Sequence, residues 1–205
     1  LYGGTELLIR KFLPDFNIQT GELNDGLDEK SMLDSIRNAS KKGRVAMVFI
    51  ESPANPTNSL VDIEALNRVL DTIKSETGHR PISVCDNTLM GPIFQQVVPQ
   101  GIDIAMYSLT KYVGGHSDLV AGAVCGSIEM LRPVRATRGM LGLTLDPHSS
   151  WMISRSLETL NIRMQRSADS GYKVAKWIND NPYIPAEVLH PDLIEDEVYQ
   201  SVYKR

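Results

Sequence analysis

The sequence of 205 residues lacks several features that would assign it to a common class of protein. A membrane-spanning helix needs about 20 consecutive apolar residues, and no segment approaches that length. Positive charge is not in excess, because the formal net charge is −4. Nucleic acids and anionic membranes bind clustered positive charge, and the only basic run, residues 132–138, is explained by a solvated helix edge. The sequence therefore argues against both partners, and a cytoplasmic location is the default.

Cysteine and histidine are also scarce, which limits disulfide and metal chemistry. Cys85 and Cys125 both lie in apolar runs, so we expect two reduced thiols in the core rather than a disulfide or a metal pair. His116 and Asp118 are close in sequence, but two ligands without a third nearby make a weak metal site. We therefore predict no metal.

Two phosphate-binding patterns are missing as well. The nucleotide-binding loop requires GxxxxGK[ST], and a dinucleotide site requires GxGxxG at the start of a helix; neither string is present.

The chain starts without methionine, with a predicted glycine turn in "LYGGT", and stops inside a polar, helix-like stretch. We expect it to be an internal piece of a longer protein.

What the sequence does contain is an alternation of apolar runs and helical patterns. The runs at residues 44–50, 81–86, 103–108 and 119–125 are typical of buried strands. Apolar residues repeat at helical spacing in residues 27–40 and 61–76. This order predicts an α/β domain in which right-handed crossovers connect a mostly parallel sheet.

The sequence pattern changes after Gly126. Residues 146–182 carry apolar residues at helical spacing and predict one long helix or two consecutive helices. We expect residues 1–145 to form a large α/β domain whose N-terminal part is missing. Residues 146–205 would form a helical connection that leads toward a further, missing C-terminal domain.

Polar residues follow the predicted strands. Asn55, Asp86, Ser108, Thr110 and Lys111 all come just after consecutive strands. Each has an ordinary explanation alone, since Asp86 could cap a turn and Asn55 lies in a proline-containing loop. The carboxyl ends of parallel strands meet at one edge of a sheet, where ligands bind. We therefore expect these side chains to gather there.

Lys111 is the residue that needs an explanation. An unpaired ammonium strongly resists burial, so a lysine at the end of a buried strand either reaches the surface or uses its nitrogen for chemistry. Pyridoxal 5′-phosphate (PLP) requires a lysine for its aldehyde, an acid for its ring nitrogen, and hydroxyl and backbone donors for its phosphate. Bound as an imine, Lys111 would no longer be a free ammonium.

Four ordered segments carry a resemblance to a known family: "LYGGT", "ESPANPTNSLVDIEAL", "CDNTLMGPIFQQVVPQGIDIAMYS" and "SLTKYVGGHSD". They resemble the Cys/Met-metabolism PLP enzymes, which include cystathionine γ-synthase, cystathionine γ-lyase and methionine γ-lyase. The resemblance covers nearly the whole chain. It implies the large domain of an aminotransferase-like fold, PLP fold type I.

The resemblance also implies roles for individual residues. Lys111 would form the Schiff base with PLP and later transfer protons, and Asp86 would pair with the pyridinium nitrogen. Ser108 and Thr110 would donate to the phosphate. Asn55 would hydrogen-bond the phenolic oxygen of the cofactor. In addition, Tyr2 would stack on the ring and act as an acid toward the leaving group. Without the resemblance, Tyr2 would be interpreted as a core aromatic residue beside a turn.

The expected activity is γ-replacement or γ-elimination on a small sulfur-containing amino acid, in a homo-oligomer of the dimer or tetramer type. Methionine γ-lyases often have cysteine where this chain has Gly4, and the family's arginine for the substrate carboxylate lies outside the chain. Two alternatives remain open. The chain could be a catalytically silent module of the same fold, which binds or regulates, or a nucleotide-binding α/β domain.

Overall fold

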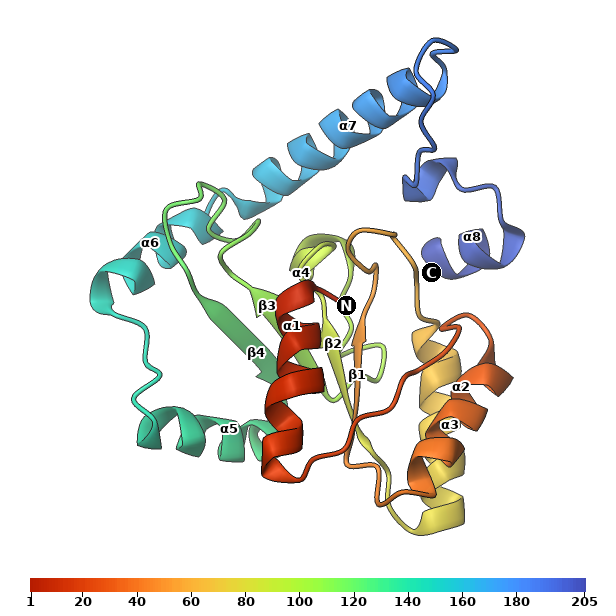
Figure 1. The fold of residues 1–205 in the computed structure, drawn as a ribbon. Coiled ribbons are helices and arrows are strands. Elements are labelled where there is room, and N and C mark those ends of the chain that lie inside the picture. The colour runs from red at the N-terminus through yellow and green to blue at the C-terminus, as the bar shows by residue number, and fades with distance from the viewer.

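The computed structural model describes all 205 residues and is built around one four-stranded sheet (Figure 1). The strands are β1 (Met47–Glu51), β2 (Ile82–Asp86), β3 (Ile104–Ser108) and β4 (Gly122–Gly126), in the spatial order β1-β2-β3-β4. The first three are parallel, and β4 runs antiparallel to β3. The predicted strands and the mostly parallel sheet are confirmed.

Two amphipathic helices pack together beside β1 at the right of Figure 1: α2 (Glu29–Ser40) and α3 (Ile63–Thr77). Both begin at an aspartate that accepts backbone N–H bonds of the first turn, Asp28 for α2 and Asp62 for α3. Such caps satisfy donors that have no partner inside the helix. Helix α3 ends at Gly78, whose φ of +76° is a left-handed conformation that glycine adopts without strain.

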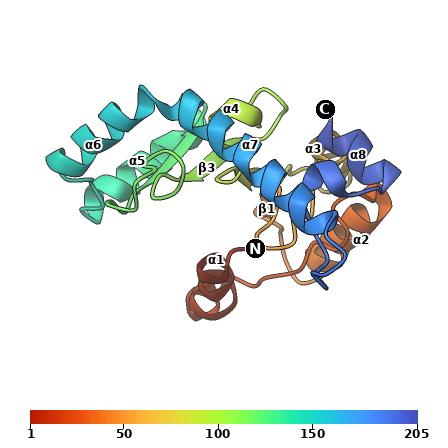
Figure 2. The ribbon, with the colours of Figure 1, turned by 90° about the horizontal axis from the view of Figure 1, so that it is seen from above.

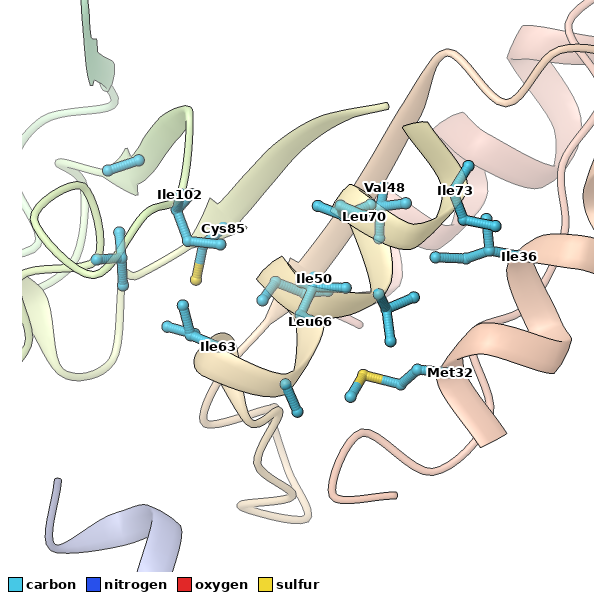
Figure 3. Close-up of a cluster of buried hydrophobic side chains, with 14 residues drawn as sticks. Met32, Ile36, Val48, Ile50, Ile63, Leu66, Leu70, Ile73, Cys85 and Ile102 are labelled. Carbon is cyan, nitrogen blue, oxygen red and sulfur yellow. The ribbon is translucent and has the colours of Figure 1, made fainter. Parts of the chain in front are cut away.

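The main core lies between these helices and one face of the sheet (Figure 3). Leu66 and Leu70 of α3 are fully buried, and full burial of such a side chain contributes about 1.5–3 kcal/mol. The strands turn alternate residues toward this core. The labelled core residues in Figure 3 are Met32, Ile36, Val48, Ile50, Ile63, Leu66, Leu70, Ile73, Cys85 and Ile102.

Helices dominate the second half of the chain. After the short α4 (Gly91–Phe94) and β4 come α5 (Ile128–Met140), α6 (Pro147–Leu157) and α7 (Leu160–Asn179), then η3 (Pro191–Leu193) and α8 (Glu197–Tyr203). The region 146–182 therefore forms two consecutive helices, one of the two predicted arrangements. Helix α7 extends across the top of the molecule in Figure 1 and over the sheet region in Figure 2. The division of the chain at residue 145 stays a prediction.

None of these helices combines the length and the apolar character that crossing a membrane requires.

The last helix, α8, returns to the body of the domain. The hydroxyl of Tyr199 donates to the carbonyl of Asn58 at 2.7 Å, and Arg205 pairs with Asp62 and Glu64 at the start of α3. Burial raises the pKa of Tyr199 to about 12. These contacts fix the C-terminal segment beside the loop that follows β1.

Two local expectations are wrong. The glycines of "LYGGT" do not form a turn: helix α1 (Gly3–Leu7) starts there, because the Tyr2 carbonyl accepts the N–H of Glu6 at 3.0 Å, and η1 (Leu8–Phe12) and η2 (Leu13–Phe16) continue it. Cys125 is exposed rather than buried, because it lies on β4, the edge strand of the sheet; Cys85 is buried as expected.

Candidate functional site

The candidate site lies where the parallel strands end. Glu51 of β1 and Asp86 of β2 are partners in register, and Asp86 is the partner of Met106 on β3. Side chains alternate between the two faces of a sheet, so Ser108, two residues after Met106, shares a face with both carboxylates. This face is opposite to the one that carries Ile50 and Cys85 into the main core. The predicted gathering at the carboxyl edge is therefore present for these residues.

Asp86 is held by a residue that the sequence did not single out. Its Oδ1 accepts both the N–H and the hydroxyl of Thr88, at 3.1 and 2.6 Å. The same Thr88 hydroxyl accepts the N–H of Ser108 at 2.8 Å, which links β2 to β3. Asp86 is 8% exposed, forms no ion pair, and makes no hydrogen bond through Oδ2. One oxygen of a nearly buried carboxylate is thus available to a ligand.

Glu51 connects two of the predicted site residues. Its Oε2 accepts the backbone N–H of Tyr2 at 2.6 Å, and its Oε1 accepts the backbone N–H of Asn55 at 3.1 Å. The α-amino group of Leu1 lies 3.7 Å from Oε2. Glu51 is 8% exposed, while the side chains of Tyr2 and Asn55 are exposed.

Lys111 lies in the turn that follows β3 and not in a strand. Its N–H donates to the carbonyl of Ser108 at 3.2 Å, and its carbonyl accepts the N–H of Gly115 at 2.7 Å. Of the two alternatives for this lysine, the structure shows a side chain that reaches the surface, because the turn leaves Lys111 exposed. Its Nζ lies 6.0 Å from the ring centroid of Tyr2, within the range of a cation–π contact. The structure thus brings Lys111 and Tyr2 together.

A second residue missed by the sequence reasoning holds this turn. Arg163 of α7 donates from Nη1 to the carbonyl of Tyr112 at 2.6 Å, and from Nη2 to the carbonyls of Val113 and Ser156 at 3.0 and 2.8 Å. Gly115 has φ of +80°, and a Cβ there would lie 2.0 Å from Nη1 of Arg163. The glycine therefore allows the guanidinium to approach the turn that carries Lys111.

The two predicted phosphate donors differ. The Thr110 hydroxyl donates to the carbonyl of Ala121 at 3.3 Å and accepts the N–H of the same residue at 3.1 Å. Its proton is therefore already engaged within the protein. The hydroxyl of Ser108 makes no hydrogen bond and remains available. The roles of both residues stay predictions.

Neutral groups occupy the opposite face of the same strands. Burial, and to a smaller extent the charges of Asp86 and Glu51, raises the pKa of the Cys85 thiol to about 12. Burial also raises the pKa of Tyr107, whose hydroxyl accepts from Asn87 at 3.2 Å. The charged groups are thus concentrated on the candidate-site face alone.

Surface hollows elsewhere do not coincide with the site. One of about 430 Å³ along α7 is lined by Ala168, Asp169, Tyr172, Lys173 and Asp192. A neighbouring hollow of about 480 Å³ shares Tyr172 and Lys173. Neither hollow contains a predicted site residue. The candidate site is therefore located from the polar side chains at the carboxyl edge of the sheet.

The fold and this edge define a class: an α/β protein with an amine, a nearly buried carboxylate and a free hydroxyl at the ends of parallel strands. The sequence model of the family described as "Cys/Met metabolism PLP-dependent enzyme" matches residues 1–205. The chain belongs to that family.

Individual relatives agree. The chain is 33% identical over 198 residues to an L-methionine γ-lyase of Fusobacterium nucleatum subsp. polymorphum, covering 93% of this chain and 47% of that protein. It is 31% identical to a chloroplastic cystathionine γ-synthase of Arabidopsis thaliana, covering 93% of this chain and 33% of the other. The chain therefore spans half or less of the length of these curated relatives.

The fold matches a solved structure as well. A crystal structure of cystathionine γ-lyase from Lactobacillus plantarum, complexed with L-serine, has a TM-score of 0.82 and 26% identity to the chain. The match covers 98% of this chain and 51% of that one. The α/β fold class is therefore confirmed.

Residues at the carboxyl edge fit the cofactor of this family. A pyridinium N–H needs an acceptor that is not already paired with a protein cation, and Oδ2 of Asp86 meets this requirement. The aldehyde needs an accessible amine, which Lys111 supplies. The phosphate needs hydroxyl or N–H donors, and the hydroxyl of Ser108 is unengaged.

Proposed function

We propose that this chain is the large, PLP-binding part of an enzyme that catalyses γ-replacement or γ-elimination on sulfur-containing amino acids. One observation carries the proposal: the nearly buried Asp86 has one oxygen without a donor, on the sheet edge that also holds Glu51, Ser108 and the Lys111 turn. Family membership supports the cofactor, and the relatives' names support the reaction class.

The residues have distinct tasks in this proposal. PLP, when bound, supplies the electron sink that stabilises a carbanion at the substrate's α-carbon. Asp86 accepts a hydrogen bond at Oδ2 and keeps the ring nitrogen protonated. The amine of Lys111 would hold the cofactor through its aldehyde and, when free, would act as the base that removes the α-proton and then the β-proton of the substrate. Tyr2, beside Lys111, donates a proton to the leaving group at the γ-carbon.

The substrate carboxylate also needs a partner. In this proposal an arginine from outside residues 1–205 binds it, and this contact sets which bond stands perpendicular to the conjugated ring. We propose a small amino-acid substrate and a homo-oligomer in which the site is completed.

The test uses the full-length protein. We expect it to be yellow with PLP, and borohydride reduction followed by peptide mapping should place the cofactor on Lys111. Lys111→Ala should remove the imine absorption band and lower kcat/KM by at least about 10³-fold, because no other amine replaces it. Lys42→Ala, at an exposed lysine without an ion pair, is the matched control.

Product analysis then separates the reactions. O-acetylhomoserine with a thiol tests γ-replacement, while methionine and cystathionine test elimination to a 2-oxo acid and ammonia. A colourless protein that takes up no PLP would support a silent module, and stabilisation by ATP or NAD instead would support a nucleotide-binding domain.

A further inference from the structure

Glu51 is a nearly buried carboxylate for which the proposed chemistry has no direct use. It ends β1, is 8% exposed, and pairs with no side-chain cation. A buried carboxylate that only filled space would be costly, because the charge loses its hydration. The presence of this charge at the edge of the sheet therefore needs an explanation.

The two oxygens of Glu51 serve two different segments. Oε2 accepts the N–H of Tyr2, 49 residues away in sequence, at 2.6 Å; Oε1 accepts the N–H of Asn55 at 3.1 Å. Tyr2 immediately precedes α1, and Asn55 lies in the loop after β1. A single rigid strand end thus fixes the backbone at both residues.

The position of Glu51 relative to Asp86 is fixed as well. The two are partners in the β1–β2 register, on strands that lie about 4.8 Å apart. Asp86 is in turn tied to β3 through Thr88 and Ser108. Tyr2 and Asn55 are therefore connected through Glu51 to the same frame that holds the proposed partner of the ring nitrogen.

We infer that Glu51 is a positioning residue of the proposed cofactor site, which holds Tyr2 and Asn55 at fixed places relative to Asp86 and Lys111. The inference rests on the proposed function. A carboxylate accepts both N–H bonds at once, whereas an amide of the same shape presents an NH₂ group to one of the two donors. Glu51→Gln should therefore release one of the two segments with little change in volume.

The experiment measures PLP binding by the full-length protein, prepared without cofactor and titrated with PLP. We expect Glu51→Gln to weaken PLP affinity about tenfold, which is the effect of one lost hydrogen bond. It should also reduce the circular dichroism of the bound cofactor band, because the aromatic ring beside the cofactor is less well fixed. Glu51→Asp, which keeps the charge on a shorter side chain, should lie between wild type and Glu51→Gln.

A merely structural role predicts a different result. Asp62→Ala is the matched control, because Asp62 also accepts two backbone N–H bonds, those of Glu64 and Ala65 at the start of α3, and none from Tyr2 or Asn55. It should lower the Tm of the cofactor-free protein without weakening PLP binding. A Glu51→Gln protein that behaves like this control overturns the inference.

A combined variant tests the route of action. If Glu51 acts through Tyr2 and Asn55, adding Glu51→Gln to Tyr2→Ala/Asn55→Ala should weaken PLP binding no further, since contributions that share a path are not additive. A full tenfold additional loss overturns the inference. If Glu51→Gln does not fold, Glu51→Asp is measured in the same background with the same criterion.

The inference and the proposed function fail in different ways. Wild-type protein that takes up no PLP overturns both. Wild-type protein that binds PLP, with Glu51→Gln binding it equally well, overturns the role of Glu51 alone.

Discussion

The two ends of the sheet differ in how their charged side chains are paired. At the amino end, Oδ2 of Asp103 accepts the N–H of Ser83 at 2.8 Å, the hydroxyl of Ser83 at 2.9 Å, and Nη1 of Arg80 at 3.0 Å. Arg80 also donates to Asp71 and Asn67. Every charge in this network has an opposite charge within the protein.

At the carboxyl end the carboxylates have amide and hydroxyl donors but no side-chain cation. Asp86 uses a single oxygen, and Lys111, in the turn after β3, forms no ion pair and is exposed. Oδ2 of Asp86 is not sealed inside the protein, since the buried side-chain atoms without a partner are His79 Nε2, Asn87 Oδ1 and Gln95 Oε1. The charges of the amino end are thus paired within the protein, whereas the carboxyl end leaves an oxygen of Asp86 open, as the proposed cofactor site requires.

The largest expected difference between the ends comes from Asp86→Asn. The amide oxygen can still accept from Thr88, but an NH₂ group replaces the free Oδ2 and cannot accept a pyridinium proton. We expect kcat/KM of the full-length enzyme to fall about 100-fold or more, in line with the loss of a preorganised electrostatic partner. The Tm of the cofactor-free protein should stay the same or rise, because an unpaired buried charge is removed.

Asp118→Asn, at an exposed carboxylate in the loop after Lys111, is the control for this change and should leave both quantities unaltered. Near-normal turnover in Asp86→Asn, or a clear drop in Tm without a loss of activity, would place Asp86 with the structural network instead.

Much of this contrast is predictable from the sequence, because strand order alone places residues at one end or the other. Apolar runs that alternate with helical patterns predicted the sheet, and the polar residues after the strands predicted that Asp86 and Ser108 would share an edge. Aspartates at the helix starts, such as Asp62, are local signals of the same kind.

What the sequence could not supply is the partner of each polar atom. The bond from Tyr2 to Glu51 spans 49 positions and the bond from Arg163 to Tyr112 spans 51, so both depend on how separate elements pack. The exposure of Lys111 and the engagement of the Thr110 hydroxyl with Ala121 have the same origin. Patterns of single residues carry no information on these pairings.

Asp103→Ala should produce the reverse of the effect of Asp86→Asn. It removes one of the three acceptors of Arg80 and leaves the N–H and hydroxyl of the fully buried Ser83 without their acceptor, so we expect the free energy of unfolding to fall by about 2–3 kcal/mol. Denaturant unfolding measures this loss of stability. The turnover rate, measured at a temperature where the variant is folded, should be unchanged. Asp71→Ala, which removes an acceptor with a largely exposed side chain, should cost under about 1 kcal/mol. A loss of PLP affinity in Asp103→Ala would show that the two ends are coupled.

The smallest effect separates the two faces at the carboxyl end. Burial raises the pKa of the Cys85 thiol to about 12 in the folded protein, whereas the thiol of an unfolded chain ionises near pH 8.5. The stability from this raised pKa is complete below the unfolded value and is lost as the pH rises toward 12. Between about pH 8 and pH 9.5, wild type should therefore lose about 1 kcal/mol more unfolding free energy than Cys85→Ala, which has no thiol to titrate. Equal losses in the two proteins would mean that Cys85 ionises as freely as an exposed thiol, and that the core face behind Asp86 is open to water.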